Sequence, residues 1–196
     1  KRGTFTFCMC PGGEIVNAAS EEGGSLVNGM SNSTRNGEFS NSAVVVGIGP
    51  KDYGIELFSG MEYQRKIERA SFEAANGYGA IFQRLTDFME GEKSSGSIKT
   101  SYTNKIVSGE FDNILPEIIC KNMRMAFKER SRNKSFISSH ANLIGTETRT
   151  SAKKKKKRDE RGSSISIENL YPVGEGAGYA GGIVSSAVDG LKIVDM

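Results

Sequence analysis

The residues best suited to chemistry lie in a glycine-rich segment near the end of the chain. It holds five glycines within nine residues: Gly174, Gly176, Gly178, Gly181 and Gly182. We predict a strand over residues 169–173, a glycine turn, and a helix that begins near Gly181 and runs toward Val194. Such a turn aims backbone N–H groups and the positive end of the helix dipole at one spot, with no Cβ in the way. The pattern predicts a site for an anionic or electron-rich ligand. The alternative is a tight connection that binds nothing.

The glycine-rich segment matches neither of two common nucleotide-binding motifs. Gly174, Gly176 and Gly178 follow one another as in a dinucleotide fingerprint, but we do not interpret them as one, because the acidic residues further on, Asp189 and Asp195, fall within or directly after the predicted helix rather than after a second strand. A phosphate-binding P-loop would need Lys-Ser or Lys-Thr after the glycines, and neither pair follows them. The residues alone therefore predict only a ligand at a helix N-terminus.

Three longer stretches of the sequence resemble parts of one protein family. The segment LYPVGEGAGYAGGIVSSAVDG, residues 170–190, resembles the C-terminal flavin-contacting segment of a family of uncharacterised FAD-dependent dehydrogenases with a glutathione-reductase-like FAD domain. Residues 4–46, which include CMCPGG and NGMS, resemble the middle region of that family, and GTETRTSA at 145–152 resembles its return strand. The resemblance implies an oxidoreductase that transfers a hydride between flavin and an unknown small-molecule substrate, with NAD(P)H as a candidate electron donor.

The same resemblance assigns cofactor-binding residues. Gly174 and Glu175 match a pair whose acidic side chain hydrogen-bonds the ribityl or diphosphate part of FAD. Gly181, Gly182 and Ile183 match the helix start that approaches the pyrimidine edge of the flavin, where N–H groups favour the reduced ring. Gly178 belongs to the turn between them. Two weaker substrate-binding candidates are Arg149, which could instead pair with a carboxylate, and Tyr179, which could instead be simple packing.

The resemblance also implies that a part is missing. These flavoproteins begin with a Rossmann-type unit that carries G-x-G-x-x-G, and residues 1–60 contain no such unit. The first residue is Lys1 rather than a methionine. We therefore expect the C-terminal portion of a longer flavoprotein, whose partner is the N-terminal FAD-binding half. Alone, the chain is expected to bind FAD weakly or not at all.

Cysteine and histidine offer no metal site or catalytic residue that we can assign. Cys8 and Cys10 form a C-x-C pair with only Cys120 and His140 elsewhere, which is too sparse for a four-ligand zinc site. Exchange of the Cys8 and Cys10 thiols with flavin is a weaker alternative to a structural role. We expect His140 to lie on the surface or in a turn. The catalytic residues remain unidentified.

The charge and cysteine content of the chain bear on its partners and its compartment. The net charge of +3 arises from 26 basic and 23 acidic residues, and the run Lys153 to Lys157 with Arg158 carries more than the whole excess. We predict no general nucleic-acid binding, because the basic residues are not spread along a face. The lysine run interrupts the expected return strand. The absence of a long apolar run argues against a membrane span, and three cysteines fit the cytoplasm.

The pattern of apolar residues predicts an α+β fold with a mixed or antiparallel sheet, a helical middle segment, and the C-terminal strand, glycine turn and helix of an FAD domain. Strands are expected within 4–48, at 3–10, 14–20, 25–30 and 42–49, the last of them buried on both faces. Helices are expected at about 60–131: one from Gly60, one over 80–91 that ends with Gly91 as its C-cap, and one from Asp112 to about Arg130 with Pro116 in its first turn. We predict a substrate domain over 1–140 and the C-terminal part of an FAD-binding domain over 141–196. The alternative function is a non-catalytic ligand-binding or assembly module that uses the glycine turn.

Overall fold

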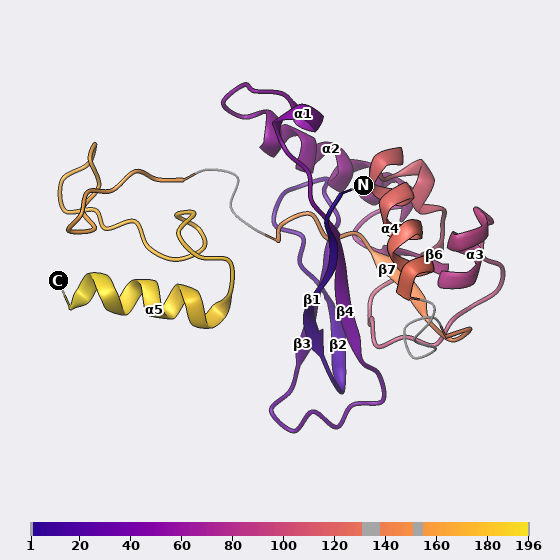
Figure 1. Cartoon of the computed structure of the whole chain (residues 1–196). Coiled ribbons are helices and arrows are strands. Elements are labelled where there is room, and N and C mark those ends of the chain that lie inside the picture. The colour runs from indigo at the N-terminus through magenta and orange to yellow at the C-terminus, as the bar shows by residue number, and fades with distance from the viewer. Residues whose placement is uncertain (1, 131–137, 151–154, 196) are drawn as a thin grey trace. The chain divides into compact units, whose positions relative to one another are not determined.

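The computed structural model describes residues 2–130, 138–150 and 155–195. It divides into two units, Lys1–Thr148 and Arg149–Met196. Unit 1 contains every β-strand and all but one of the helices of the described residues (Figure 1). The fold is a mixed α+β fold with small sheets, as the sequence predicts.

Two antiparallel strand pairs form the first part of unit 1. β1 (Thr4–Cys10) pairs with β4 (Asn41–Val46), and β2 (Gly13–Asn17) pairs with β3 (Val27–Ser31). Gly12 connects β1 to β2 with a left-handed φ of 56°, and its missing Cβ would lie 2.2 Å from the Arg35 carbonyl oxygen.

The expectation that residues 42–49 are buried on both faces is wrong. β4 is half-buried along its length, and it belongs to a two-stranded sheet in which it pairs with β1 alone.

The centre of unit 1 is a three-stranded mixed sheet. β5 (Ala80–Arg84) runs parallel to β6 (Ile106–Ser108) and antiparallel to β7 (Asn142–Gly145). The expected helix over 80–91 is therefore wrong in its first half. Only α3 (Leu85–Glu90) is helical, and it ends at Gly91 in a left-handed conformation, as predicted. The apolar residues at 81, 82 and 85 fit either period, and hydrogen bonds to strands on both sides decide the outcome.

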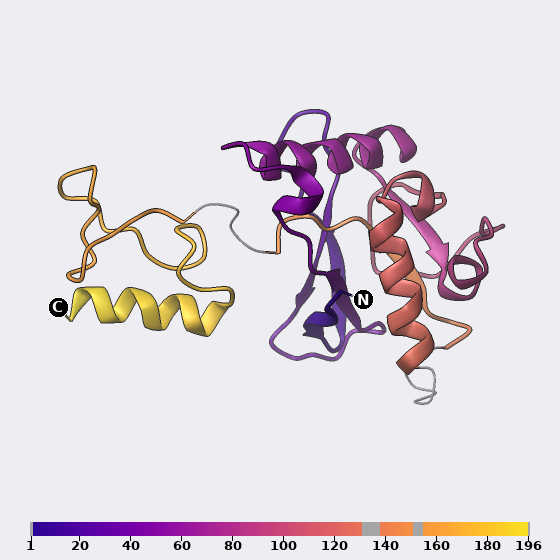
Figure 2. The ribbon, with the colours of Figure 1, turned by 45° about the horizontal axis from the view of Figure 1, so that its top comes forward.

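The helices of unit 1 contact different strands. They are α1 (Pro50–Tyr53), which packs on α2; α2 (Ser59–Ala74), which packs on β5; the 3-10 turn η1 (Phe111–Asn113); and α4 (Glu117–Arg130), which packs on β1 and β4. α2 and α4 lie roughly crosswise (Figure 2). The helix expected from Asp112 begins later, since Pro116 precedes α4 and cannot donate an amide hydrogen bond. The buried core of unit 1 comprises Ile67, Ala75, Ile81, Leu85, Phe88, Phe111, Ile114, Cys120, Met123 and Phe127.

Unit 2 consists of irregular chain and one helix, α5 (Ile183–Val194). An isolated bridge joins Arg158 to Ser164, but residues 169–173 form no strand, contrary to the expectation for the segment before the glycines. The predicted start of the final helix differs from the observed start by two residues. None of the helices in the described ranges combines the length and apolar character needed to cross a bilayer.

Candidate functional site

The glycine-rich segment forms a closed turn in unit 2. Gly174 and Gly178 have left-handed φ angles of 69° and 83°, conformations that a side chain with a Cβ rarely adopts. The N–H of Gly178 donates to the Glu175 carbonyl at 2.9 Å, and the N–H of Tyr179 donates to the Gly174 carbonyl at 3.0 Å. These two hydrogen bonds account for Gly174 and Gly178 as elements of the turn itself.

The geometry of the turn does not explain the other three glycines of the segment. Gly176, Gly181 and Gly182 are absent from the left-handed residues of the described chain. A Cβ built at Gly176 or at Gly181 meets no described atom within 4 Å, and one at Gly182 makes only an ordinary contact of 3.6 Å with the Ser185 hydroxyl. Neither backbone conformation nor packing therefore requires glycine at these three positions. Glycine there suits the close approach of another molecule.

The N-terminus of α5 follows directly. Gly182 is the N-cap, with extended backbone, and it has no side chain with which to cap the first turn. The Ser186 N–H donates to the Gly182 carbonyl at 2.9 Å, which begins the helical ladder. The N–H groups of the first turn, including that of Ile183, have no partner within a helix by its geometry. They place a partial positive charge next to the glycine turn.

The side chains predicted to bind ligands lie in different settings. Glu175 is half-buried in the turn, and the side chain of Ile183 is 91% exposed. The ring of Tyr179 lies beneath two cations, with the Arg158 guanidinium carbon at 3.6 Å and the Lys155 ammonium at 4.3 Å from the ring centroid. These contacts favour the packing role of Tyr179. Arg149 is exposed at the start of unit 2.

Two other segments of the resemblance meet in unit 1. The Val27 N–H donates to the Thr146 carbonyl at 2.9 Å, so that the first residue of β3 lies beside GTETRTSA. The carboxylate of Glu68, 1% exposed, accepts the Thr148 hydroxyl at 2.5 Å, while the Gln64 amide donates to the Thr148 carbonyl at 2.6 Å. Burial raises the pKa of Glu147 above its ordinary value. The last two residues of GTETRTSA lie outside the described residues.

The cysteine pair lies on β1. Cys8 is exposed and has a left-handed φ of 48°, where the register between β1 and β4 shifts. The Cys10 thiol donates to the Cys8 carbonyl at 3.4 Å. Within the described ranges, no group of three or more His, Cys, Asp or Glu side chains is arranged to hold a metal ion. His140 is exposed in a turn.

Sequence reasoning missed Asp189 and Arg158. Asp189 lies on α5 and accepts the N–H of Gly174 at 2.9 Å, and Arg158 pairs with the same carboxylate. The available signals were weak: an acidic residue in a helix whose other charged residue is Lys192, and an arginine that ends the lysine run. That run also contacts the turn, since the Lys156 N–H donates to the Ala177 carbonyl at 3.0 Å. Lys153 and Lys154 lie outside the described residues.

The chain is similar to known proteins over most or all of its length. A family described as "FAD-dependent protein, C-terminal domain-like" matches residues 1–150. An uncharacterised protein of Clostridium beijerinckii is 42% identical over 200 residues, an alignment that covers 100% of this chain but only 38% of the relative. The chain therefore spans well under half the length of that relative, and the alignment includes the whole glycine-rich segment.

Proposed function

Because this chain belongs to the FAD-dependent protein, C-terminal domain-like family, we propose that it is part of an FAD-dependent oxidoreductase that transfers a hydride between flavin and a small organic substrate. The glycine-rich segment after the matched region would hold part of FAD. When bound, FAD supplies a ring that accepts or releases a hydride. The proposal includes NAD(P)H as the candidate electron donor, on the resemblance of the sequence to dehydrogenases.

The observation that carries this proposal is the glycine surplus. Gly174 and Gly178 are needed to form the turn, whereas Gly176 and Gly181 lie in open space with ordinary backbone. A methyl group at either position would extend into that space rather than into the protein. The residues present thus fit a ligand that approaches the backbone closely, as the flavin, ribityl and phosphate groups of a nucleotide cofactor do.

The chain itself would supply binding and electrostatics. The first-turn N–H groups at Gly182 and Ile183 would donate hydrogen bonds to an electron-rich edge, and the helix dipole would favour negative charge there. The Glu175 carboxylate would accept hydrogen bonds from ribityl hydroxyls. Arg149 is the candidate for contact with an anionic substrate group. No described residue is assigned a proton-transfer role.

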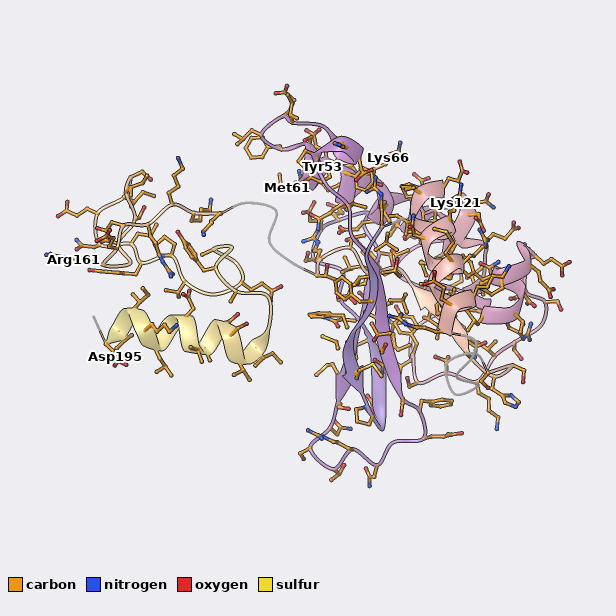
Figure 3. The ribbon with its side chains drawn as sticks, in the orientation of Figure 1. Tyr53, Met61, Lys66, Lys121, Arg161 and Asp195 are labelled. Atoms are coloured by element: carbon orange, nitrogen blue, oxygen red, sulfur yellow. The ribbon has the colours of Figure 1, made fainter. Side chains whose placement is uncertain are left out.

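The proposal also includes a partner, the N-terminal FAD-binding half of a longer polypeptide. The C. beijerinckii relative has more than half of its length outside the alignment. No residue of α5 is buried, and a row of side chains projects from it away from the loop of unit 2 (Figure 3). The apolar side chains Val184, Leu191 and Val194 are 74%, 63% and 83% exposed. An apolar face of this kind marks an interaction surface, and we assign it to that half.

The test substitutes glycines in the longer polypeptide and measures FAD affinity. Gly181→Ala should leave folding intact, because its Cβ meets nothing within 4 Å, yet it should weaken FAD binding. Gly190→Ala is the matched control, since that glycine lies within α5 and also has open space around its Cβ position. FAD affinity that is equal for Gly181→Ala and Gly190→Ala would contradict the proposed contact.

A second variant separates the proposal from the alternative of a non-catalytic module. Glu175→Gln removes the charge of the turn carboxylate, and a hydrogen bond to a charged group contributes about 1.5–3 kcal/mol. The dissociation constant of FAD should therefore rise about tenfold or more. The exposed Glu168 provides the control, as Glu168→Gln. An unchanged FAD affinity in Glu175→Gln favours the module.

A further inference from the structure

The Arg158–Asp189 ion pair is the best-defined charged contact of unit 2. The Arg158 guanidinium donates to both carboxylate oxygens of Asp189, at 2.9 and 2.7 Å. The two side chains are only 15% and 14% exposed. A two-pronged arginine–carboxylate pair fixes orientation as well as distance. The pair therefore holds the segment that contains Arg158 against α5 in a defined geometry.

Asp189 also reaches the glycine turn. The oxygen that accepts one Arg158 hydrogen bond, Oδ2, also accepts the Gly174 N–H at 2.9 Å. Gly174 opens the turn, and its left-handed backbone has no Cβ to restrict it. A hydrogen bond to a carboxylate on a helix is hence what anchors the first residue of the turn. The arginine and then the Gly174 N–H hold the pKa of Asp189 at about 2, so the carboxylate is charged at neutral pH.

Arg158 holds both sides of the turn. One of its nitrogens, Nη1, also donates to the Pro172 carbonyl at 2.8 Å, two residues before Gly174. Its guanidinium stacks at 3.6 Å on Tyr179, which directly follows Gly178. Arg158 is itself fixed by the bridge to Ser164 and by a turn in which the Asp159 carboxylate accepts the Ser163 N–H at 2.9 Å. The entry and the exit of the glycine turn are thus tied to one guanidinium.

We propose that Asp189, oriented by Arg158, is a positioning residue that fixes the glycine turn in the shape that receives FAD. This inference rests on the proposed function. Asp189 does not contact the cofactor in this account, because Arg158 and Gly174 occupy its carboxylate. Its role is to reduce the conformational freedom of the turn before the ligand arrives, which lowers the entropic cost of binding. The ion pair also offsets the negative charge of Asp189 beside a site for an anionic ligand.

Amide hydrogen exchange of Gly174 tests the anchor without any flavin. In the 196-residue chain, Asp189→Ala should accelerate exchange at Gly174 by about tenfold or more, as expected for loss of a charge-assisted hydrogen bond. Asp189→Asn retains an acceptor oxygen and should give a smaller change. Asp195→Ala, at the exposed end of α5, is the control. Equal exchange at Gly174 in Asp189→Ala and Asp195→Ala overturns the proposal.

FAD retention by the longer polypeptide tests the consequence. Asp189→Ala and Arg158→Gln should weaken FAD binding and alter the circular dichroism of bound flavin, while Arg158→Lys should restore only part of both, because lysine lacks the fork. Faster Gly174 exchange with unchanged FAD affinity and dichroism overturns the positioning role. If the unsubstituted polypeptide binds no FAD, the proposed function fails, and the positioning role falls with it. The exchange measurement then still decides whether Asp189 anchors the turn.

Discussion

The exposed fraction of the apolar side chains on α5 sets the size of the effect expected when one of them is truncated. Leu191 is already 63% exposed, so Leu191→Ala removes little buried surface from the chain itself. Full burial of a leucine side chain stabilises by about 1.5–3 kcal/mol, and roughly a third of that applies here. We therefore expect a loss of no more than about 1 kcal/mol in the free energy of unfolding of this chain. In the longer polypeptide, where the FAD-binding half would bury the exposed part of Leu191, the substitution should also remove the remaining two thirds of this burial energy.

The measurement compares two forms of the protein. Urea denaturation of the 196-residue chain measures the small loss in its free energy of unfolding. Binding of the chain to a separately expressed FAD-binding half measures the larger loss, which is a loss of association. Loss of the buried Leu191 contact should weaken that association by about tenfold. Adding Val194→Ala, at a side chain that is 83% exposed, should enlarge the association effect and leave the chain's own stability nearly unchanged.

Ile193 provides the matched control on the opposite face of α5. It is half-buried and packs so closely on Gly162 that a Cβ there would lie 2.3 Å from its Cδ1 atom. Ile193→Ala should therefore destabilise unit 2 in the chain alone. The reasoning is refuted if Leu191→Ala destabilises the chain as much as Ile193→Ala does, or if it leaves association with the FAD-binding half unchanged.

Three further predictions concern unit 1. Phe88 is 0% exposed between Phe111 and Phe127, so Phe88→Ala should reduce the free energy of unfolding by about 3–5 kcal/mol in urea denaturation, and a loss below about 1 kcal/mol would contradict this packing. Hydrogen bonds from Arg124 lower the pKa of Asp112, so their stabilisation is present above the unfolded pKa of about 3.9 and is lost as pH falls through the lower folded value. Asp112→Asn should flatten the pH dependence of unfolding between about pH 5 and 2, and an unchanged dependence argues against the pair. Burial raises the pKa of Cys120 to about 12, so iodoacetamide should alkylate this thiol only in denaturant, whereas labelling in the native protein, detected by mass spectrometry, would show that the core opens.

Local signals predicted much of the fold. Periodicity identified α2 and α5, and alternation with turn residues identified β1 to β3. The prediction of a helix over 80–91 was wrong in its first half because the apolar residues there suit a helix or a strand equally. The choice depends on pairing with β6 and β7, which are distant in sequence. Likewise, the short β6 (Ile106–Ser108) has no local signal and forms only because β5 offers an edge.

The candidate site was predictable in part. Glycine spacing indicated the turn and the helix start, since these are local properties of residues 174–183. The anchor at Asp189 was not predictable, because it joins Gly174 to a residue 15 positions later and to Arg158 in another loop. A sequence shows charges and their spacing along the chain, but it does not show which carboxylate meets which backbone amide. The strand expected at 169–173 is absent from unit 2.

The flavin content of the longer polypeptide shows whether the glycine-rich segment belongs to a flavin site. The polypeptide should be purified without added cofactor, denatured, and its supernatant examined for flavin absorbance and for FAD by mass spectrometry. We expect stoichiometric FAD in the unsubstituted protein and less in Gly181→Ala. A colourless protein that also fails to take up FAD on reconstitution would contradict the claim that the glycine-rich segment belongs to a flavin site.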